Sequence, residues 1–77
     1  MAKPTQPMQR AAQELASAAR AMRNALALFE TIAYAESNGD VERIDTMSLS
    51  QIGIEMIGQY AERAQSESEW FEEARNA

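Results

Sequence analysis

Apolar side chains recur at intervals of seven residues along the first part of the chain. Such an interval places side chains on one side of an α-helix, because about 3.6 residues make one turn. The pattern predicts a helix over about residues 7–37 with one continuous apolar face. Three parallel rows make up that face: Met8, Leu15, Met22 and Phe29; Ala11, Ala18, Ala25 and Ile32; and Ala12, Ala19, Leu26 and Ala33.

The ends of this helix are predicted by local signals. Pro7 lies at the first turn, where a missing backbone N–H does no harm, so we expect a start at Thr5 or Gln6. Gly39 follows the last periodic residue, and glycine adopts the left-handed conformation that closes a helix. The helix should therefore end near residues 37–38.

A second helix is predicted to begin at Ser48. Ser48 and Gln51 have the spacing of a capping box, and Met47 and Ile52 that of a hydrophobic staple. Its main apolar face is Leu49, Ile52, Met56, Tyr60, Ala64, Phe71 and Ala74, with Ile54, Ile57 and Ala61 to one side.

The second helix contains two glycines. Gly53 and Gly58 each cost about 1 kcal/mol relative to alanine inside a helix. We expect them to permit a close approach to the alanine-rich first helix. A turn near residue 42 would put Phe29 near Met56. A ligand or partner loop lying over a glycine is the alternative.

The expected fold class is all-α. Helices at about 7–37 and 48–74, joined by a connector at 38–47, would form one antiparallel two-helix hairpin over residues 1–77. Charge favours this orientation. Residues 1–29 carry four basic side chains against one acidic, whereas the rest of the chain carries eleven acidic side chains against three arginines, and the net charge is −5.

The two helices carry more apolar surface than one interhelical contact can cover. A set of side chains is left over, and exposed apolar strips of this size usually mark interfaces. We expect a homodimer that forms a four-helix bundle, with a hetero-complex as the alternative. The candidate interface residues are Leu28, Tyr34, Ile54, Ile57 and Ala61.

Composition argues against several functions. The chain has no cysteine and no histidine, which removes the commonest nucleophiles, bases and metal ligands. Glu62, Glu69 and Glu73 lie near one another on a helix, but they fit a solvated face better than a metal site. We expect no enzyme activity, no cofactor and no metal. The acidic balance also argues against direct nucleic-acid binding.

No stretch reaches the roughly 20 apolar residues of a membrane-spanning helix, and "MAKPTQPMQR" lacks the apolar core of a signal peptide. We therefore expect a cytoplasmic location without membrane contact. Small, acidic, alanine-rich hairpins of this kind occur among bacterial and phage accessory proteins, a likeness of architecture that assigns no residue a role.

The acidic C-terminal stretch "SESEWFEEARNA" is the best candidate for recognition. Trp70 and Phe71 are adjacent, so on a helix they point about 100° apart and cannot share one narrow contact. Trp70 either packs within the protein or serves as an exposed anchor. In the second case the candidate partner-binding residues are Trp70, Glu67, Glu69, Glu72 and Glu73.

These features suggest a small regulatory protein that binds another protein through an acidic, aromatic-bearing surface. The partner would offer a basic or apolar groove. Two alternatives are an acidic decoy that blocks a nucleic-acid-binding surface of its target and a structural subunit that folds fully only with a larger partner.

Overall fold

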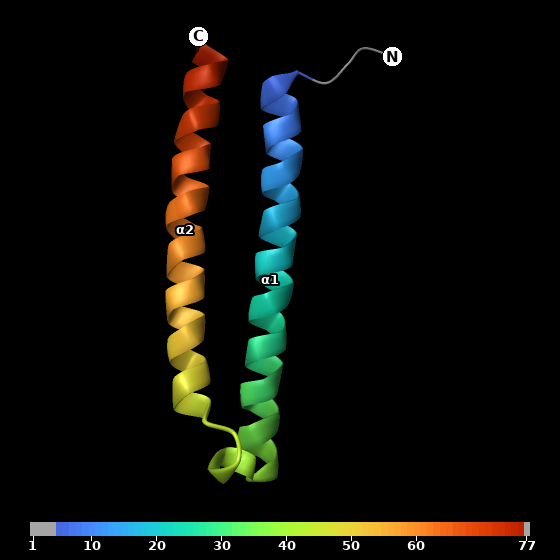
Figure 1. The fold of residues 1–77 in the computed structure, drawn as a ribbon, viewed down its shortest axis with the longest axis vertical. Helices are drawn as coiled ribbons and strands as arrows, with labels where there is room; N and C mark the ends of the chain where they lie inside the picture. Colours follow the sequence, from blue (N-terminus) through green and yellow to red (C-terminus); the bar gives the residue numbers. More distant parts are fainter. Residues whose placement is uncertain (1–4, 77) are drawn as a thin grey trace.

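Two long antiparallel helices form the molecule (Figure 1). The computed structural model describes residues 5–76. Helix α1 spans Gln6–Asn38, a short 3-10 turn, η1, spans Asp40–Glu42, and α2 spans Thr46–Asn76. The start of α1 and the end of α2 lie at one end of the hairpin, called here the open end, and the connector forms the other, the turn end. The predicted all-α helical hairpin is confirmed.

Both ends of α1 form where the sequence predicts them. At the start, the Thr5 hydroxyl accepts a hydrogen bond from the Met8 backbone N–H at 3.2 Å. At the other end, Gly39 has a φ of 69° and donates its backbone N–H to the Ala35 carbonyl. Few other residues adopt this left-handed conformation without strain.

Helix α2 begins at Thr46, two residues before the expected Ser48. The residue that caps it is Asp45, whose carboxylate accepts the Ser48 backbone N–H at 2.9 Å and the Ser48 hydroxyl at 2.7 Å. These hydrogen bonds lower the pKa of Asp45. The prediction of Ser48 as the first residue was wrong because an aspartate three positions earlier satisfies the same backbone donor.

The hairpin is one layer of helices, with extents of 54 × 26 × 13 Å. A single helix with its side chains is about 10–12 Å across, so no residue among 5–76 covers the two broad sides of the layer. Within residues 5–76, Ala35 and Gly53 alone are classed as buried. The contact between the helices is therefore a line of residues rather than a core.

This line, called here the seam, follows alternating steps of three and four residues. It is made largely of small side chains on α1. Its positions are Ala11, Glu14, Ala18, Ala21, Ala25, Leu28, Ile32 and Ala35 on α1, and Leu49, Gly53, Met56, Tyr60, Glu67 and Trp70 on α2.

The largest apolar side chains of α1 lie outside the seam, contrary to the expected core. Met22 is 66% exposed and Phe29 is 55% exposed. We expected Phe29 to meet Met56 of α2. In the structure the neighbouring Leu28 meets α2 instead, and its contact there is Gly53. Helices approach most closely through small residues, and this turns the row of large side chains toward solvent. The same holds for Met8, Leu15 and Leu26.

The two glycines of α2 differ in surroundings, so alanine substitutions should separate them. A Cβ atom at Gly53 would lie 2.7 Å from the Leu28 Cδ2 atom, whereas one at Gly58 would meet nothing within 4 Å. Both substitutions gain the same helix propensity. We expect Gly53→Ala to be less stable than Gly58→Ala by about 1–2 kcal/mol, because Leu28 must leave its rotamer or the helices must separate.

Urea unfolding followed by circular dichroism measures this difference. The double variant Leu28→Ala, Gly53→Ala should recover part of the loss by removing the clash. Equal stabilities for the two single variants would mean that the contact of Leu28 with Gly53 does not set the helix spacing.

Candidate functional site

Among the described residues 5–76, one broad side of the hairpin carries no charged residue. We call it the apolar face; apart from Met8, which continues the same row toward the start of α1, its positions come one or four residues after seam positions on both helices. On α1 it comprises Met8, Ala12, Leu15, Ala19, Met22, Leu26, Phe29 and Ala33. On α2 it comprises Ser50, Ile54, Ile57, Ala61, Ala64, Ser68 and Phe71.

Shallow grooves run along the apolar face between the helices. One of about 340 Å³ is lined by Met22, Ile57 and Ala61, among others, and its walls are almost wholly hydrocarbon. The opposite broad side also has a groove, but Arg20 and Gln59 are among the residues that line it. The two sides of the layer therefore differ in polarity, and only one suits apolar association.

The exposed surface is large for a chain of this size. It amounts to 6280 Å² for 8.6 kDa. A globular monomer of that mass exposes roughly 4,700 Å², so the hairpin exceeds the expectation by about a third. The excess of roughly 1,600 Å² on one chain is larger than the roughly 800 Å² that each partner buries in a standard interface.

The predicted interface residues are divided by the structure. Ile54, Ile57 and Ala61 lie on the apolar face. Leu28 lies in the seam against Gly53, and Tyr34, which is 58% exposed, precedes the buried Ala35 and so lies on the opposite flank.

Sequence reasoning missed the contribution of α1 to this face, above all Leu15, Met22 and Phe29. The sequence did contain a signal for these residues, because a row of large side chains runs beside a row of alanines at the same seven-residue interval. The alanine row meets α2, and the row of large side chains remains available.

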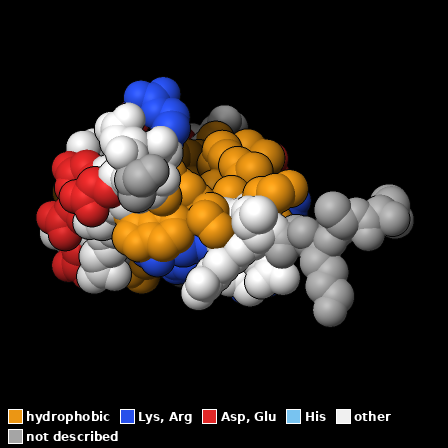
Figure 2. Space-filling view, turned by 90° about the horizontal axis from the view of Figure 1, so that it is seen from above, with side chains coloured by type: hydrophobic (Ala, Val, Ile, Leu, Met, Phe, Trp, Pro, Cys, Tyr) orange, Lys and Arg blue, Asp and Glu red, His pale blue; other side chains and the backbone are white. Residues whose placement is uncertain are grey.

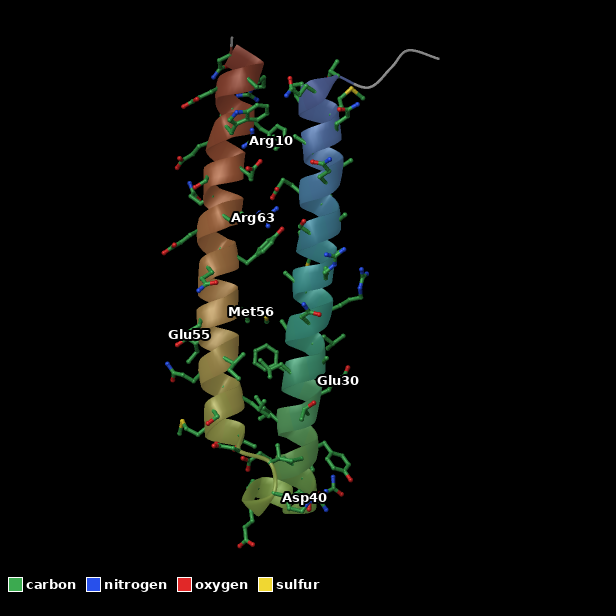
Figure 3. The ribbon with its side chains drawn as sticks, viewed as in Figure 1. Arg10, Glu30, Asp40, Glu55, Met56 and Arg63 are labelled. Atoms are coloured by element: carbon green, nitrogen blue, oxygen red, sulfur yellow. The ribbon has the colours of Figure 1, made fainter. Side chains whose placement is uncertain are left out.

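Two reciprocal ion pairs hold the open end of the hairpin together (Figure 3). Arg10 of α1 makes two hydrogen bonds of 2.7 Å to the Glu67 carboxylate of α2. In the opposite direction, Arg63 of α2 donates to Glu14 of α1 at 2.7 and 3.2 Å. The hydrogen bond from Arg10 lowers the pKa of Glu67, and bonding to Glu67 raises the pKa of Arg10.

Trp70 lies beneath this first ion pair. The central guanidinium carbon of Arg10 is 3.8 Å from the centroid of the Trp70 ring, the geometry of a cation–π contact. Phe71 meets the same ring edge-on, with centroids 5.0 Å apart. Trp70 is thus half-buried, and both Trp70 and Glu67 contact Arg10 inside the hairpin.

The other acidic candidates lie outside the seam. Glu69 accepts a hydrogen bond from Gln65 at 3.0 Å, and Glu72 pairs with Arg75 at 2.6 Å. Glu73 is exposed and makes no hydrogen bond or ion pair with a described residue.

Helical spacing places four exposed glutamates on the outer side of α2, away from α1. This set, called here the acidic row, is Glu55, Glu62, Glu69 and Glu73. Figure 3 shows Glu55 pointing outward from α2, and Figure 2 shows acidic side chains gathered on one side of the molecule. The acidic row and the apolar face lie on different sides of α2.

The two surfaces offer hydrocarbon on one side and carboxylates on the other. Among residues 5–76, no three acidic side chains come close enough together to hold a metal ion. Neither described helix has the length of apolar sequence needed to cross a membrane. The arrangement suits association by burial of hydrocarbon and by ion pairing.

The pair of Arg10 and Glu67 predicts a pH dependence of stability. The pKa of Glu67 is lowered in the folded state, so its contribution is present above the ordinary glutamate pKa and is lost as the pH falls through the lowered value. We expect the wild type to lose more stability than Glu67→Gln between about pH 6 and pH 3. Glu67→Gln should also be the less stable of the two at pH 7.

Glu73→Gln is the matched control, because it removes the same charge one turn or two further along α2 without removing an ion pair to a described residue. Its loss of stability on acidification should follow the wild type. Parallel curves for all three proteins in urea unfolding would contradict a role for the ion pair.

Comparison with known proteins gives no relative: no family model, no curated protein and no solved structure matches this chain.

Proposed function

We propose that this protein is a non-enzymatic interaction protein that works as a homodimer and binds another protein through the acidic side of α2. The observation that carries the proposal is the apolar face, on which both helices expose large side chains and no charge. Two hairpins stacked on these faces would form a four-helix bundle, and the buried faces would supply the apolar core that a single hairpin lacks.

The apolar face supports this assembly by its extent and its composition. It runs from Met8 to Ala33 on α1 and from Ser50 to Phe71 on α2, nearly the whole length of both helices. Ile57, at its centre, is 43% exposed, and Ile54 beside it is 65% exposed. Burying side chains of this kind contributes about 1.5–3 kcal/mol each, which a one-layer hairpin otherwise forgoes.

The acidic row supports the second part of the proposal. Helix α2 carries six acidic residues against two arginines, whereas acidic and basic residues are equal in number on α1. Because the acidic row lies on the outer side of α2, it stays exposed when the apolar face is covered. A basic surface on a partner protein would be attracted to it over a distance of about one Debye length.

Trp70 has a smaller part in this proposal than the sequence suggests. Its ring is half-buried and covered on one face by Arg10, so it is not an independent anchor. It contributes to the partner surface by fixing the open end of α2, on which Glu69, Glu72 and Glu73 are presented.

The dimer is tested by the substitution Ile57→Glu. A carboxylate at the centre of a buried apolar interface has no partner there, so we expect dimerisation to weaken by about 100-fold or more. Sedimentation equilibrium should give about twice 8.6 kDa for the wild type and 8.6 kDa for the variant. Gln59→Glu is the control, because it adds the same charge on the polar side of α2.

The melting temperature of the wild type should also rise with protein concentration, since dissociation accompanies unfolding of a dimer. A wild type of 8.6 kDa at all concentrations would contradict the dimer. A poorly helical monomer would instead favour a structural subunit that folds with a larger partner.

The acidic row is tested by replacing all four of its glutamates with glutamine. Proteins retained by the immobilised wild type at low salt should be lost by this variant and should elute from the wild type as salt rises. The double variant Glu30→Gln, Glu36→Gln removes charge from α1 and should retain them. Retention that survives the four substitutions contradicts the proposed surface, and displacement by duplex DNA would favour the decoy.

A further inference from the structure

The apolar face has two halves of unequal bulk. On α2, the half nearer the turn end presents Ser50, Ile54 and Ile57, and the half nearer the open end presents Ala61, Ala64 and Ser68, with Phe71 at its far end. On α1 the difference is smaller, because Leu26 and Phe29 lie in the turn half and Met8 and Leu15 in the open half. On α2 the middle of the face is therefore bulkier on its turn side than on its open side, while Phe71 adds bulk at the far open end.

The large and small residues are placed symmetrically about one level of the hairpin. Leu28 of α1 lies level with Gly53 of α2. Six residues from these positions toward the open end, Met22 of α1 therefore lies level with Gln59 of α2. On α2, Ile57 and Ala61 are equally far from Gln59. On α1, Phe29 and Leu15 are equally far from Met22.

We propose that two copies stack on their apolar faces with their turns at opposite ends, so that α1 lies on α1 and α2 lies on α2. The two-fold axis passes at the level of Met22 and Gln59. This orientation rests on the dimer proposed above and specifies how its second copy is seated. It is the arrangement in which the isoleucines of one copy's α2 meet the alanines of the other's.

On α2 this arrangement pairs large side chains with small ones. Ile54 lies opposite the partner's Ala64, and Ile57 lies opposite the partner's Ala61. Further out, Ser50 lies opposite the partner's Ser68. On α1, Phe29 lies opposite the partner's Leu15, and the two copies of Met22 meet on the axis. The α2 pairs alternate large with small side chains, as close packing without voids or overlaps requires, whereas the α1 pairs bring large side chains together.

The rival arrangement places both turns at the same end. There α1 lies on the partner's α2 at the same level, so Phe29 and Leu26 meet the partner's Ile54 and Ile57. In the other half, Leu15 and the neighbouring alanines of α1 meet the partner's Ala61 and Ala64. The bulky half would hold the small half apart, and the resulting void would forfeit the contacts there.

Charges at the two ends of the hairpin do not choose between the arrangements. Residues 36–45 carry four acidic side chains and one arginine, and the open end, residues 5–14 with 67–76, carries five acidic side chains and two arginines. The excess of negative charge is therefore the same at each end. Shape is the feature that distinguishes the two arrangements.

Stacking α2 on α2 has a consequence for the partner surface. The acidic rows of both copies come to lie on one side of the bundle and form a single strip of eight carboxylates, to which each copy contributes four. The complete surface exists only in the dimer. The carboxylates of the two rows repel each other. Salt screens this repulsion, because the two copies of α2 lie about one Debye length apart.

Single cysteines test the orientation cleanly, because the chain has none of its own. Met22→Cys should cross-link to itself, by oxidation or by a short bis-maleimide, about tenfold faster than it cross-links to Ile57→Cys in a mixture of the two variants. In the rival arrangement the order of the two rates is reversed, because Met22 then faces α2 of the other copy. Gln59→Cys, on the polar side, should cross-link poorly.

Molar mass and circular dichroism on the same variants separate the possible failures. A dimer in which the Met22→Cys self-link is not the faster reaction overturns the orientation and leaves the dimer intact. A monomeric, helical protein without cross-links overturns the dimer and the orientation together. A dimer that self-links at Met22→Cys and becomes tighter as salt is raised supports both.

Discussion

The close approach of α1 to α2 along the seam is the contact on which the rest of the structure depends. Alanines of α1 and Gly53 of α2 let the helices come near each other, and Leu28 fills the space that the missing Cβ leaves. A narrow seam of small residues has no room for the large apolar side chains. Met22, Phe29 and their neighbours are thereby displaced onto one broad side of the layer.

This displacement explains how the hairpin is held together. A seam in which Ala35 is the one apolar residue classed as buried supplies little hydrophobic stabilisation. Near the open end, the ion pairs of Arg10 with Glu67 and of Arg63 with Glu14 cross between the helices, so polar contacts fix the orientation there. Exposed ion pairs specify geometry better than they stabilise it. Burial of the apolar face is therefore the change that would stabilise the protein most.

The separation of the two surfaces gives the proposed function its physical basis. The apolar face and the acidic row lie on different sides of α2, so one can be covered by a second copy while the other remains in solvent. Burial of the apolar face also positions the acidic row, since the orientation of the two copies determines whether their acidic rows lie next to each other. Association would thus assemble the surface offered to a partner, rather than compete with it.

The sequence by itself determined the elements and most of their ends. Thr5 and Gly39 act through backbone groups within four residues, and Gly39 adopts the same conformation whatever lies opposite. Asp45 is equally local, and the error of two residues at the start of α2 came from preferring one short-range signal to another. The spacing of apolar residues also predicted that both helices are amphipathic.

The tertiary structure alone decided which of the parallel rows forms the seam. All three rows of α1 have the same interval, and the choice among them depends on the distance at which the helices meet, a property of the pair. The same holds for Glu67 and Trp70, since the sequence left open whether Trp70 packs within the protein or joins Glu67 on an exposed recognition surface. Their partner, Arg10, lies 57 residues from Glu67 in the chain and reaches it only when the helices are side by side.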